Sequence, residues 1–253
     1  MKAAERSRVI LDRVETEGEV GIADLAEGLG VSEMTIRRDL ERLEAAGAVR
    51  RVQGRVTKGV SGSYEPPFAL RLDRQVAQKA AIAEEVARLI ADRETVVLDG
   101  GTTGVAVAHA LVGRQLTVCT PSLHVADVLR EAPDIRLMVT GGFIRRGEES
   151  LVGPSALATL AAHRFDTYVM TVSGIDARQG CTEWNVDDAS VKRTALDVST
   201  RCLVAADSSK FGSIAFARVC GLADVTTVVS DAGLGSAHRE AVVMTGAGLR
   251  IAP

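Results

Sequence analysis

Residues 31–44 read Val-Ser-Glu-Met-Thr-Ile-Arg-Arg-Asp-Leu-Glu-Arg-Leu-Glu, and this stretch decides the fold of the first part of the chain. At about 100° per residue, the side chains of Ile36, Leu40 and Leu43 share one stripe of a helix. The other side and its flanks carry methionine, threonine and arginine: Met34, Thr35, Arg37, Arg38 and Arg42. An aliphatic stripe opposite a cationic face predicts a recognition helix that enters the major groove of DNA.

The surrounding residues predict a winged helix-turn-helix domain. We expect helices over residues 5–17 and 24–29, followed by the recognition helix over 33–46. Ser32 can cap that third helix through its hydroxyl. Residues 49–53 alternate apolar and polar side chains, which is the period of a strand. This strand and the residues after it would form the wing, which lies along the DNA backbone or minor groove.

Positive charge is concentrated in this part of the chain. Residues 31–60 contain seven Lys or Arg against four Asp or Glu, whereas the whole chain has a net charge of −3. Arginine forks can read guanine edges or hold phosphates. On periodicity alone, a solvated charged face without any ligand would explain the same pattern. The low overall charge indicates that a nucleic-acid contact must be local.

The stretch 31–44 resembles, almost residue for residue, the recognition-helix signature of DeoR-type bacterial transcription regulators. The resemblance implies a double-stranded DNA operator contacted by Ser32, Met34, Thr35, Arg37, Arg38, Arg51, Gln53 and Arg55. The family's wing usually ends in Gly-Gly-Ala, whereas here Arg55 follows Gly54 in place of the second glycine. That arginine is an additional candidate for a phosphate contact.

A change in composition marks a second domain. Residues 58–67 concentrate Gly, Ser and Pro and predict a linker between an N-terminal domain, 1–57, and a second domain, 68–253. In the second domain, short β-branched runs alternate with helical stretches, which predicts an α/β fold with a mostly parallel sheet. We expect a helix over 73–91 and strands over 95–98, 116–119, 135–139, 168–172, 202–205 and 226–229.

Three of the expected strands end in turns suited to an anion. Residues 99–104 read Asp-Gly-Gly-Thr-Thr-Gly and precede a helix, so backbone amides and two hydroxyls are available to a phosphate. Thr120 and Gly141-Gly142 follow the next two strands, and Lys210 follows a later one. Open α/β sheets bind ligands at the carboxyl ends of their strands. Each glycine turn taken alone is also explained as purely structural.

The resemblance to DeoR-type regulators extends from about Arg6 to Asp231. In the second domain the matching motifs are Phe68-x-x-Arg71, Lys79-x-x-Ile82-Ala83, Asp99-x-Gly101-Thr102-Thr103, Gly141-Gly142, Gly180-x-Thr182 and Asp207-x-x-Lys210-Phe211-Gly212. It implies a sensor domain similar to sugar-phosphate isomerases of the ribose-5-phosphate isomerase kind, in a homo-oligomer of two or four subunits. It also implies a repressor of a sugar or polyol catabolic operon that responds to a phosphorylated sugar or polyol. The implied effector-binding residues are Asp99, Gly101, Thr102, Thr103, Thr120, Gly141, Gly142 and Lys210.

One position of the sensor domain departs from the family. Pro121 stands where the family commonly has Asn in a Thr-Asn-Ser turn. The proline removes a side-chain amide and one backbone donor, both of which could bind an effector.

Two other classes of function remain open from the sequence. A sugar-phosphate isomerase fused to a DNA-binding domain would need a base, for which Asp99, Asp176, Asp207 and Glu183 are candidates by type. The four histidines lie within or beside expected helices, where we expect structural roles. A structural adaptor without a small ligand is the third interpretation. We expect a regulator that is not an enzyme and uses no cofactor.

The four cysteines and the hydropathy pattern carry further expectations. The cysteines are scattered, with no Cys-x-x-Cys pair and no histidine spaced for zinc, so we expect free thiols and no metal site. No apolar block follows the N-terminus, and the weakly charged stretch 95–113 contains Asp99 and several glycines. We therefore expect a cytoplasmic protein that does not contact a membrane.

Overall fold

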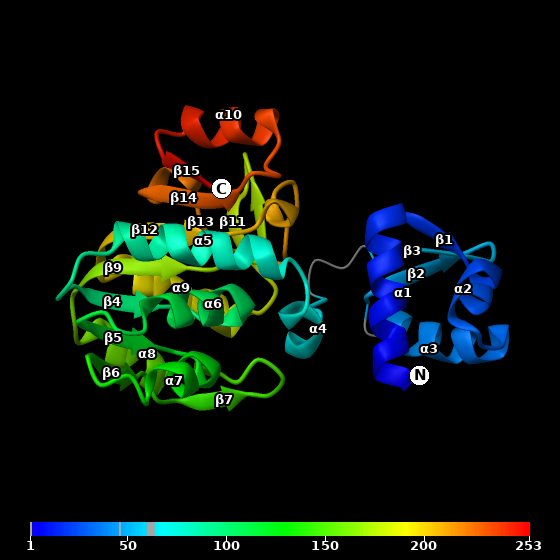
Figure 1. Ribbon diagram of the computed structural model, residues 1–253, viewed down its shortest axis with the longest axis horizontal. Coiled ribbons are helices and arrows are strands. Elements are labelled where there is room, and N and C mark those ends of the chain that lie inside the picture. Colours follow the sequence, from blue (N-terminus) through cyan, green and yellow to red (C-terminus); the bar gives the residue numbers. More distant parts are fainter. Residues whose placement is uncertain (1, 46, 60–63) are drawn as a thin grey trace. The chain divides into compact units, whose positions relative to one another are not determined.

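The computed structural model describes residues 2–45, 47–59 and 64–253 and divides into two compact units, residues 1–66 and 67–253 (Figure 1). The first unit contains α1 (Ala3–Glu17), β1 (Glu19–Gly21), α2 (Ile22–Leu29), α3 (Glu33–Ala45), β2 (Val49–Val52) and β3 (Arg55–Lys58). β3 pairs antiparallel with both β1 and β2. The predicted winged helix-turn-helix fold is confirmed. Ala46 and residues 60–63 of the expected linker lie outside the described residues.

The helical stripe read from the sequence forms the core of this unit. Ile36, Leu40 and Leu43 are buried where α3 packs against α1 and α2. The wing is a hairpin whose two-residue turn, Gln53 and Gly54, has positive φ angles of 49° and 79°. Two positive φ angles in succession suit the right-handed twist of a tight hairpin. Because Gly54 already supplies the second of them, Arg55 starts β3 without breaking the hairpin.

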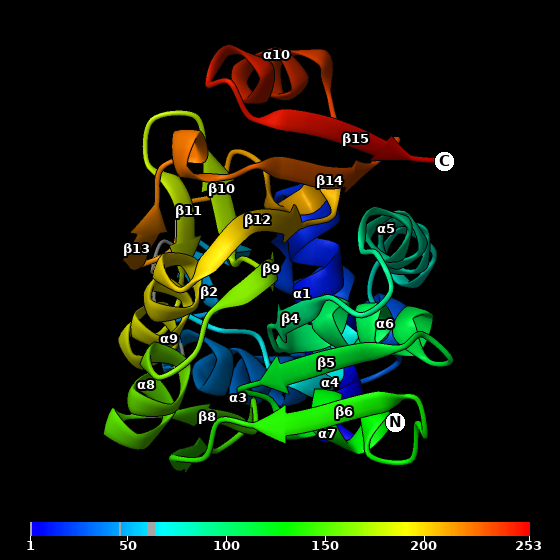
Figure 2. The same cartoon turned by 90° about the vertical axis from the view of Figure 1, so that its left-hand side faces the viewer.

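The second unit is built on a seven-stranded, fully parallel sheet of order β15-β14-β12-β9-β4-β5-β6 (Figure 2). Its strands are β4 (Thr95–Leu98), β5 (Leu116–Thr120), β6 (Ile135–Val139), β9 (Phe165–Met170), β12 (Ser199–Ala205), β14 (Thr227–Asp231) and β15 (Gly248–Ala252). The chain adds strands on one side of β4 and then returns to add strands on the other side. This reversal places a topological switch point between β4 and β9.

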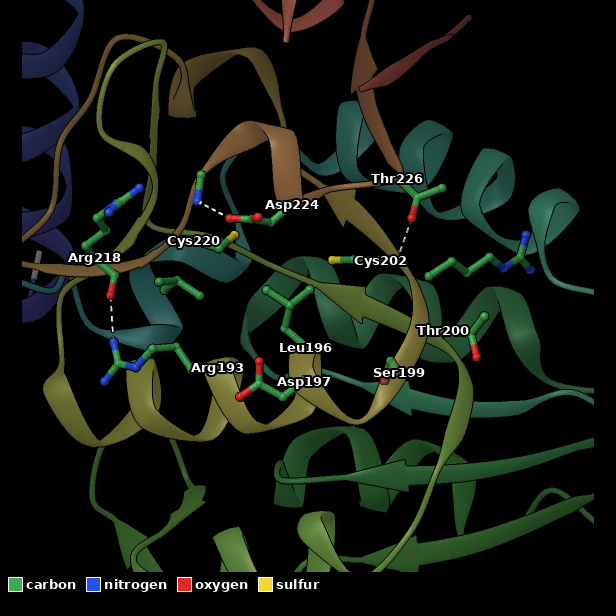
Figure 3. A pocket seen from close by; sticks show the side chains of 13 residues that line it. Arg193, Leu196, Asp197, Ser199, Thr200, Cys202, Arg218, Cys220, Asp224 and Thr226 are labelled. Atoms are coloured by element: carbon green, nitrogen blue, oxygen red, sulfur yellow. Dashed lines mark hydrogen bonds between the residues drawn. The ribbon is translucent and has the colours of Figure 1, made fainter. Parts of the chain in front are cut away.

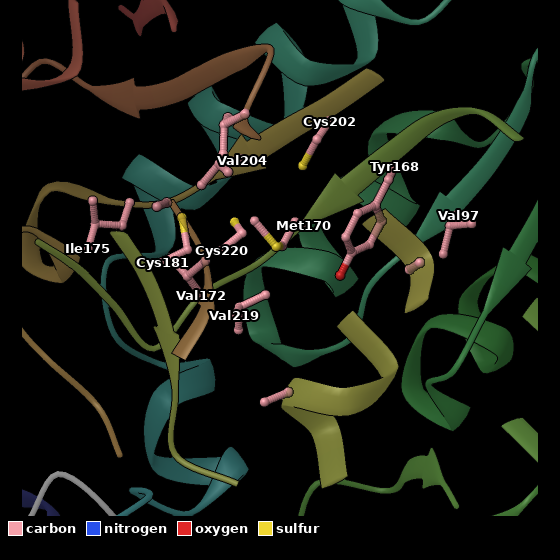
Figure 4. Close-up of a cluster of buried hydrophobic side chains, with 14 of the residues drawn as sticks. Val97, Tyr168, Met170, Val172, Ile175, Cys181, Cys202, Val204, Val219 and Cys220 are labelled. Atoms are coloured by element: carbon pink, nitrogen blue, oxygen red, sulfur yellow. The ribbon is translucent and has the colours of Figure 1, made fainter. Parts of the chain in front are cut away.

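Helices cover both faces of the sheet, and each face has its own core. The helices are α5 (Val76–Leu89), α6 (Gly101–Leu111), α7 (Leu123–Leu129), α8 (Pro154–Ala161), α9 (Val186–Asp197) and α10 (Ser236–Met244). Val96 and Leu98 of β4 pack in the core with α5, α6 and α7. Val97, between them, belongs to the other core with α8 and α9, part of which appears in Figure 4. The alternation follows from the two-residue period of a strand.

Smaller elements surround the sheet. They are α4 (Phe68–Leu72), the hairpin β7 (Phe143–Arg145) and β8 (Ser150–Val152), the antiparallel set β10 (Gly174–Asp176), β11 (Gly180–Glu183) and β13 (Ala217–Cys220), and the 3-10 turns η1 (Ser208–Lys210) and η2 (Leu222–Asp224). None of these strands was expected from the sequence, and neither was β15.

Two further expectations about the second unit are confirmed with shifted bounds. The helix expected over 73–91 is α5, which is shorter at both ends, and the separate helix α4 before it was not predicted. The break comes at Gln75, whose φ of 51° is left-handed and stops a helix, while the Lys79 ammonium donates to the carbonyls of Arg71 and Arg74. The strand expected over 168–172 is β9, which ends at Met170 and starts three residues earlier.

Candidate functional site

The outer face of α3 presents side chains suited to a DNA groove. Met34 is 61% exposed, and Arg37 and Arg38 are also exposed. Arg37 pairs with Glu33 at 3.1 Å across one helical turn, on a surface where both side chains are half exposed. The Ser32 hydroxyl accepts from the Thr35 amide at 3.3 Å and lies 3.0 Å from the Thr35 hydroxyl, so both polar groups sit at the start of α3.

A buried ion pair that was not predicted from the sequence holds α3 to α1. Asp39 lies among the arginines of α3, yet its carboxylate is buried and accepts from Arg6 Nε at 2.5 Å. The two residues are 33 positions apart in the chain. At about 100° per residue Asp39 lies about 60° from Ile36, beside the apolar stripe, but a charged side chain is expected on the solvated face of a helix, so its burial was not predicted. The pair fixes the position of α3 on its supporting helix.

The wing arginines differ in how firmly they are held. Arg51 is half-buried, and its backbone amide and guanidinium both donate to Glu44, at 2.9 and 2.7 Å. Arg55 is exposed and pairs with Glu19. Gln53 is exposed at the hairpin turn. Arg55 and Gln53 are therefore more accessible to a DNA backbone than Arg51.

In the second unit, Asp99 and the turn that it begins lie at the switch point between β4 and β9. Asp99 follows β4, and its Oδ1 accepts from the Gly100 amide at 2.8 Å. Its Oδ2 accepts from the amide and hydroxyl of Thr171, which follows β9, at 3.0 and 3.1 Å. Asp99 thus holds the two strand ends together. Ligands of open α/β sheets bind in the crevice at such a point.

The next strand ends lie beside this turn. A Cβ on Gly100 would be 3.1 Å from the Ser122 Cβ, and the Thr140 amide donates to the Thr120 carbonyl at 3.1 Å. Gly142 has a φ of 109°, and a Cβ there would lie 2.4 Å from the Val152 carbonyl oxygen. A side chain at position 142 would collide with the backbone, so the fold requires glycine here whether or not a ligand binds. The side chains of Thr102 and Thr103, in the first turn of α6, and of Thr120 are buried.

Two cations and an aromatic ring border the first turn of α6. A Cβ on Gly101 would lie 3.8 Å from Arg71 Nη1. The Arg71 guanidinium is 5.4 Å from the ring centre of Trp184, and Lys210 Nζ is 5.3 Å from the same ring. Lys210 is therefore close to the predicted site, with Arg71 and Trp184 beside it. The sequence predicts no role for Arg71 beyond its motif, and no local pattern indicates that Trp184 lies at the site.

Lys79 adds a third cation to this cluster. Burial first, and then the neighbouring charges of Lys210, Arg71 and Arg74, lower the pKa of Lys79 to about 8 against the opposing effect of Asp207. Burial is the main cause of this lower pKa, and the three neighbouring cations add to it.

Beneath the turn, a buried lysine lies between two carboxylates. Lys192 Nζ lies 2.5 Å from Asp99 Oδ2 and 3.0 Å from Glu183 Oε2, and it donates to the Thr171 carbonyl. Burial alone would lower the pKa of Lys192, but the carboxylates of Asp99 and Glu183 raise it above its usual value. Burial would likewise raise the pKa of Glu183, but Lys192 and the Ser173 hydroxyl lower it. The charges of Lys192, Asp99 and Glu183 therefore interact mainly with one another.

Comparison with known proteins agrees with both halves of this geometry. The DeoR-like helix-turn-helix domain matches residues 6–58, and the DeoR C terminal sensor domain matches residues 74–232. The chain belongs to the DeoR family of transcriptional regulators. It is therefore a DNA-binding regulator with a sensor domain for a small-molecule effector.

Several relatives of this DeoR-family regulator cover most of both chains. The glycerol-3-phosphate regulon repressor of Escherichia coli K12 is 32% identical over 92% of each chain. The transcriptional repressor CsqR of the same organism is 33% identical over 88% of this chain and 85% of its own. The transcriptional regulator GlpR of Haloferax volcanii is 31% identical over 97% and 96%. These relatives are named as regulators or repressors of transcription.

Among solved structures, the sensor domain of this DeoR-family regulator is similar to ribose 5-phosphate isomerase A. The enzyme from Neisseria gonorrhoeae is 15% identical over 53% of each chain, with a TM-score of 0.38. The delta subunit of eIF2B from Chaetomium thermophilum is 19% identical over 63% of this chain and 57% of its own, with a TM-score of 0.45.

A separate cavity of about 490 Å³ opens at the other edge of the sheet, near the amino ends of β12 and β14 (Figure 3). Its lining comes from α9, β12, β13 and the loop after β13, and includes Arg193, Arg201, Cys202, Arg218 and Cys220. The residues predicted to bind an effector lie at the carboxyl edge, so this DeoR-family regulator has two distinct polar regions on its sheet.

Within the described ranges, the DeoR-family regulator contains no cluster of three His, Cys, Asp or Glu side chains arranged to hold a metal ion. Over those same residues, no helix is long and apolar enough to cross a membrane. All four cysteines are free thiols and buried.

Proposed function

We propose that this protein is a repressor of a sugar or polyol catabolic operon whose DNA binding is released by a phosphorylated sugar or polyol. The observation that carries the proposal is the pairing of an exposed arginine face on α3 with a cation-lined switch point in the sensor unit. A relative is named for the glycerol 3-phosphate regulon, which supports a phosphorylated polyol as one candidate effector.

On the DNA side, we assign the first turns of α3 to the major groove. We assign Met34, Thr35 and Arg38 to base edges, which the exposure of Met34 and Arg38 supports, and Arg37 can exchange Glu33 for a base or phosphate. Ser32 contributes at the start of the helix. The wing residues Arg55 and Gln53 contact the DNA backbone, and Arg51 contributes to the same surface while it stays bonded to Glu44.

On the effector side, we assign a phosphate group to the first turn of α6, where backbone amides are unpaired by the helix. Gly101, Thr102 and Thr103 form this turn, and Lys210 supplies positive charge beside it. Asp99 acts indirectly because its carboxylate is fully engaged by the turn, Thr171 and Lys192. Thr120, Gly141 and Gly142 shape the neighbouring strand ends.

Ligand binding would change the spacing of DNA-binding units in a homo-oligomer of two or four subunits, so that they no longer match two half-sites. A direct test first selects a duplex from a random library with the purified protein. Fluorescence anisotropy then follows this duplex against glycerol 3-phosphate, ribose 5-phosphate and glucosamine 6-phosphate. We expect at least one ester to release the DNA and to change the fluorescence of Trp184, the single tryptophan of the chain. Release by none of a broad panel of esters would contradict the proposal.

The contacts of the candidate carboxylates favour the regulator over an isomerase. Asp99 and Glu183 face the Lys192 ammonium, Asp207 accepts from the Ser209 amide, and Asp176 accepts from backbone amides of its own hairpin. A base must reach the substrate's carbon-bound proton, and these carboxylates are occupied by their own neighbours. Incubation of the protein with the same esters should therefore leave them unchanged.

A further inference from the structure

We propose that Arg71 is a further effector-binding residue, and that the effector's anionic group takes the place of Glu148 as its partner. Through this exchange the ligand would act on α4, the helix that follows the boundary between the two units. The chemical class of the ligand, a phosphate ester, rests on the proposed function; the assignment of Arg71 and the exchange of partners go beyond it.

Arg71 occupies the position that a phosphate-binding side chain needs. Its guanidinium reaches the first turn of α6, because Nη1 would be 3.8 Å from a Cβ on Gly101. It also lies over the ring of Trp184, which Lys210 approaches too. A phosphate on this turn would thus meet Arg71 on one side and the ammonium of Lys210 near the same ring. A guanidinium binds phosphate oxygens through two parallel N–H donors, which a lysine cannot do.

Glu148 holds the place that we assign to the ligand. Its carboxylate comes from the loop between β7 and β8 and pairs with Arg71, and the two side chains are only 8% and 13% exposed. A phosphate ester near pH 7 carries up to two negative charges and three acceptor oxygens, against one charge and two oxygens for the glutamate. Because Lys210 lies near the same Trp184 ring, a phosphate beside Arg71 would also meet a second cation, and the ligand is therefore the stronger partner for Arg71.

The position of α4 in the chain makes this exchange relevant to DNA binding. α4 has five residues and follows Pro67 directly. At one end the Phe68 ring stacks on His124 with centres 4.0 Å apart, and at the other the Lys79 ammonium donates to the Arg71 carbonyl at 2.5 Å. A ligand that takes Arg71 from Glu148 changes one of the contacts that hold this short helix. The β7–β8 loop would then be released, and a shift of α4 would move the end of the linker that leads to the DNA-binding unit.

The proposal predicts that substitutions of Arg71 and of Glu148 change ligand affinity in opposite directions. Isothermal titration calorimetry with the releasing ester, and with inorganic phosphate as a minimal probe, would compare wild-type protein with Arg71→Gln, Glu148→Gln and Arg201→Gln. Arg201 is the matched control because it pairs with Glu94 at 2.8 Å at the other edge of the sheet and lines the cavity there. We expect about 30-fold weaker binding for Arg71→Gln and about 3- to 10-fold tighter binding for Glu148→Gln. Arg201→Gln should bind as wild type does.

A role for the Arg71–Glu148 pair in folding alone would weaken binding in both variants, which would overturn the proposal. Wild-type affinity in Arg71→Gln would overturn it too, as would a loss confined to Arg201→Gln, which would place the ligand in the cavity. Arg71→Lys, which keeps the charge, guards against misfolding and should show an intermediate loss. If the wild-type protein binds no phosphate ester, the proposed function fails together with this inference. If it binds and Arg71→Gln binds equally, only the inference fails.

Discussion

The two units of the chain hold their charged side chains in opposite ways. On α3, Arg37 and Glu33 form a pair whose side chains are 47% and 51% exposed. In the sensor unit, Lys192 and Asp99 are both 7% exposed. An exposed pair contributes only about 0–1 kcal/mol, so its arginine can change partners at little cost. Charges buried together are committed to the fold. The comparison teaches which charges are available for binding and which hold the binding site in shape.

The largest effect on stability is expected when the buried charges of the sensor unit lose their cation. Lys192→Met leaves the carboxylates of Asp99 and Glu183 buried without their cation, which should lower the free energy of unfolding by about 3–5 kcal/mol. Urea denaturation followed by Trp184 fluorescence measures this loss. The triple variant with Asp99→Asn and Glu183→Gln should recover part of it. A loss below about 1 kcal/mol for the single variant would remove the distinction between the two units.

On the exposed side, the expected effect is on DNA affinity and not on stability. Arg38→Ala should lower the affinity for the selected duplex by about 1–3 kcal/mol and leave the free energy of unfolding within about 0.5 kcal/mol of wild type. Fluorescence anisotropy and thermal melting give the two quantities. Arg13, a half-buried arginine of α1 that pairs with Glu17, provides the control. An equal loss of affinity in Arg13→Ala would indicate a general charge effect instead of a specific contact.

Arg51 lies between these two extremes and sharpens the comparison. Because its guanidinium and amide are both bonded to Glu44, we expect Arg51→Ala to reduce DNA affinity by less than about fivefold, a smaller loss than for Arg38→Ala. Thermal melting of the same variant should show a lower unfolding temperature, since the bond between α3 and the wing is lost. A DNA effect as large as that of Arg38→Ala would show that Arg51 leaves Glu44 for a phosphate.

The smallest effect concerns pH. The pKa of Lys79 lies at about 8, below its usual value, so its ammonium is mostly charged at pH 7 and mostly neutral at pH 9. It faces Arg71, Arg74, Lys210 and Asp207. Loss of this positive charge should weaken phosphate-ester binding by a factor of about 2–5 between pH 7 and pH 9, while the phosphate itself stays dianionic. Calorimetry at the two pH values tests this, and Lys79→Met should bind with the same affinity at both.

The sequence predicted best those features that depend on local periodicity. Ile36, Leu40 and Leu43 are buried as their spacing on one helical face predicts. The order of strands and helices in the sensor unit likewise followed from runs of β-branched residues. The helix expected over 73–91 is present as α5, which starts at Val76 because Gln75 before it is left-handed, whereas the short helix α4 was not predicted.

Contacts between distant residues could not be predicted. Asp39 and Arg6 are 33 residues apart, and Lys192 and Asp99 are 93 apart, and nothing in the local pattern of either pair indicates the partner. Arg71 belonged to a recognised motif, but its position beside Gly101 depends on how α4 folds back on the sheet. The glycine turns at the strand ends were the one local signal of the sensor site, since the carboxyl edge of a parallel sheet brings such turns together.

The most direct test of the account measures the salt dependence of DNA binding for the wild type and for the double variant Arg37→Ala/Arg38→Ala. We predict that log affinity of the wild type falls steeply with log salt, by about 0.9 for each phosphate contacted. The double variant should bind at least about 30-fold more weakly with an unchanged melting temperature. Affinity and salt slope that match the wild type would contradict the assignment of α3 to DNA.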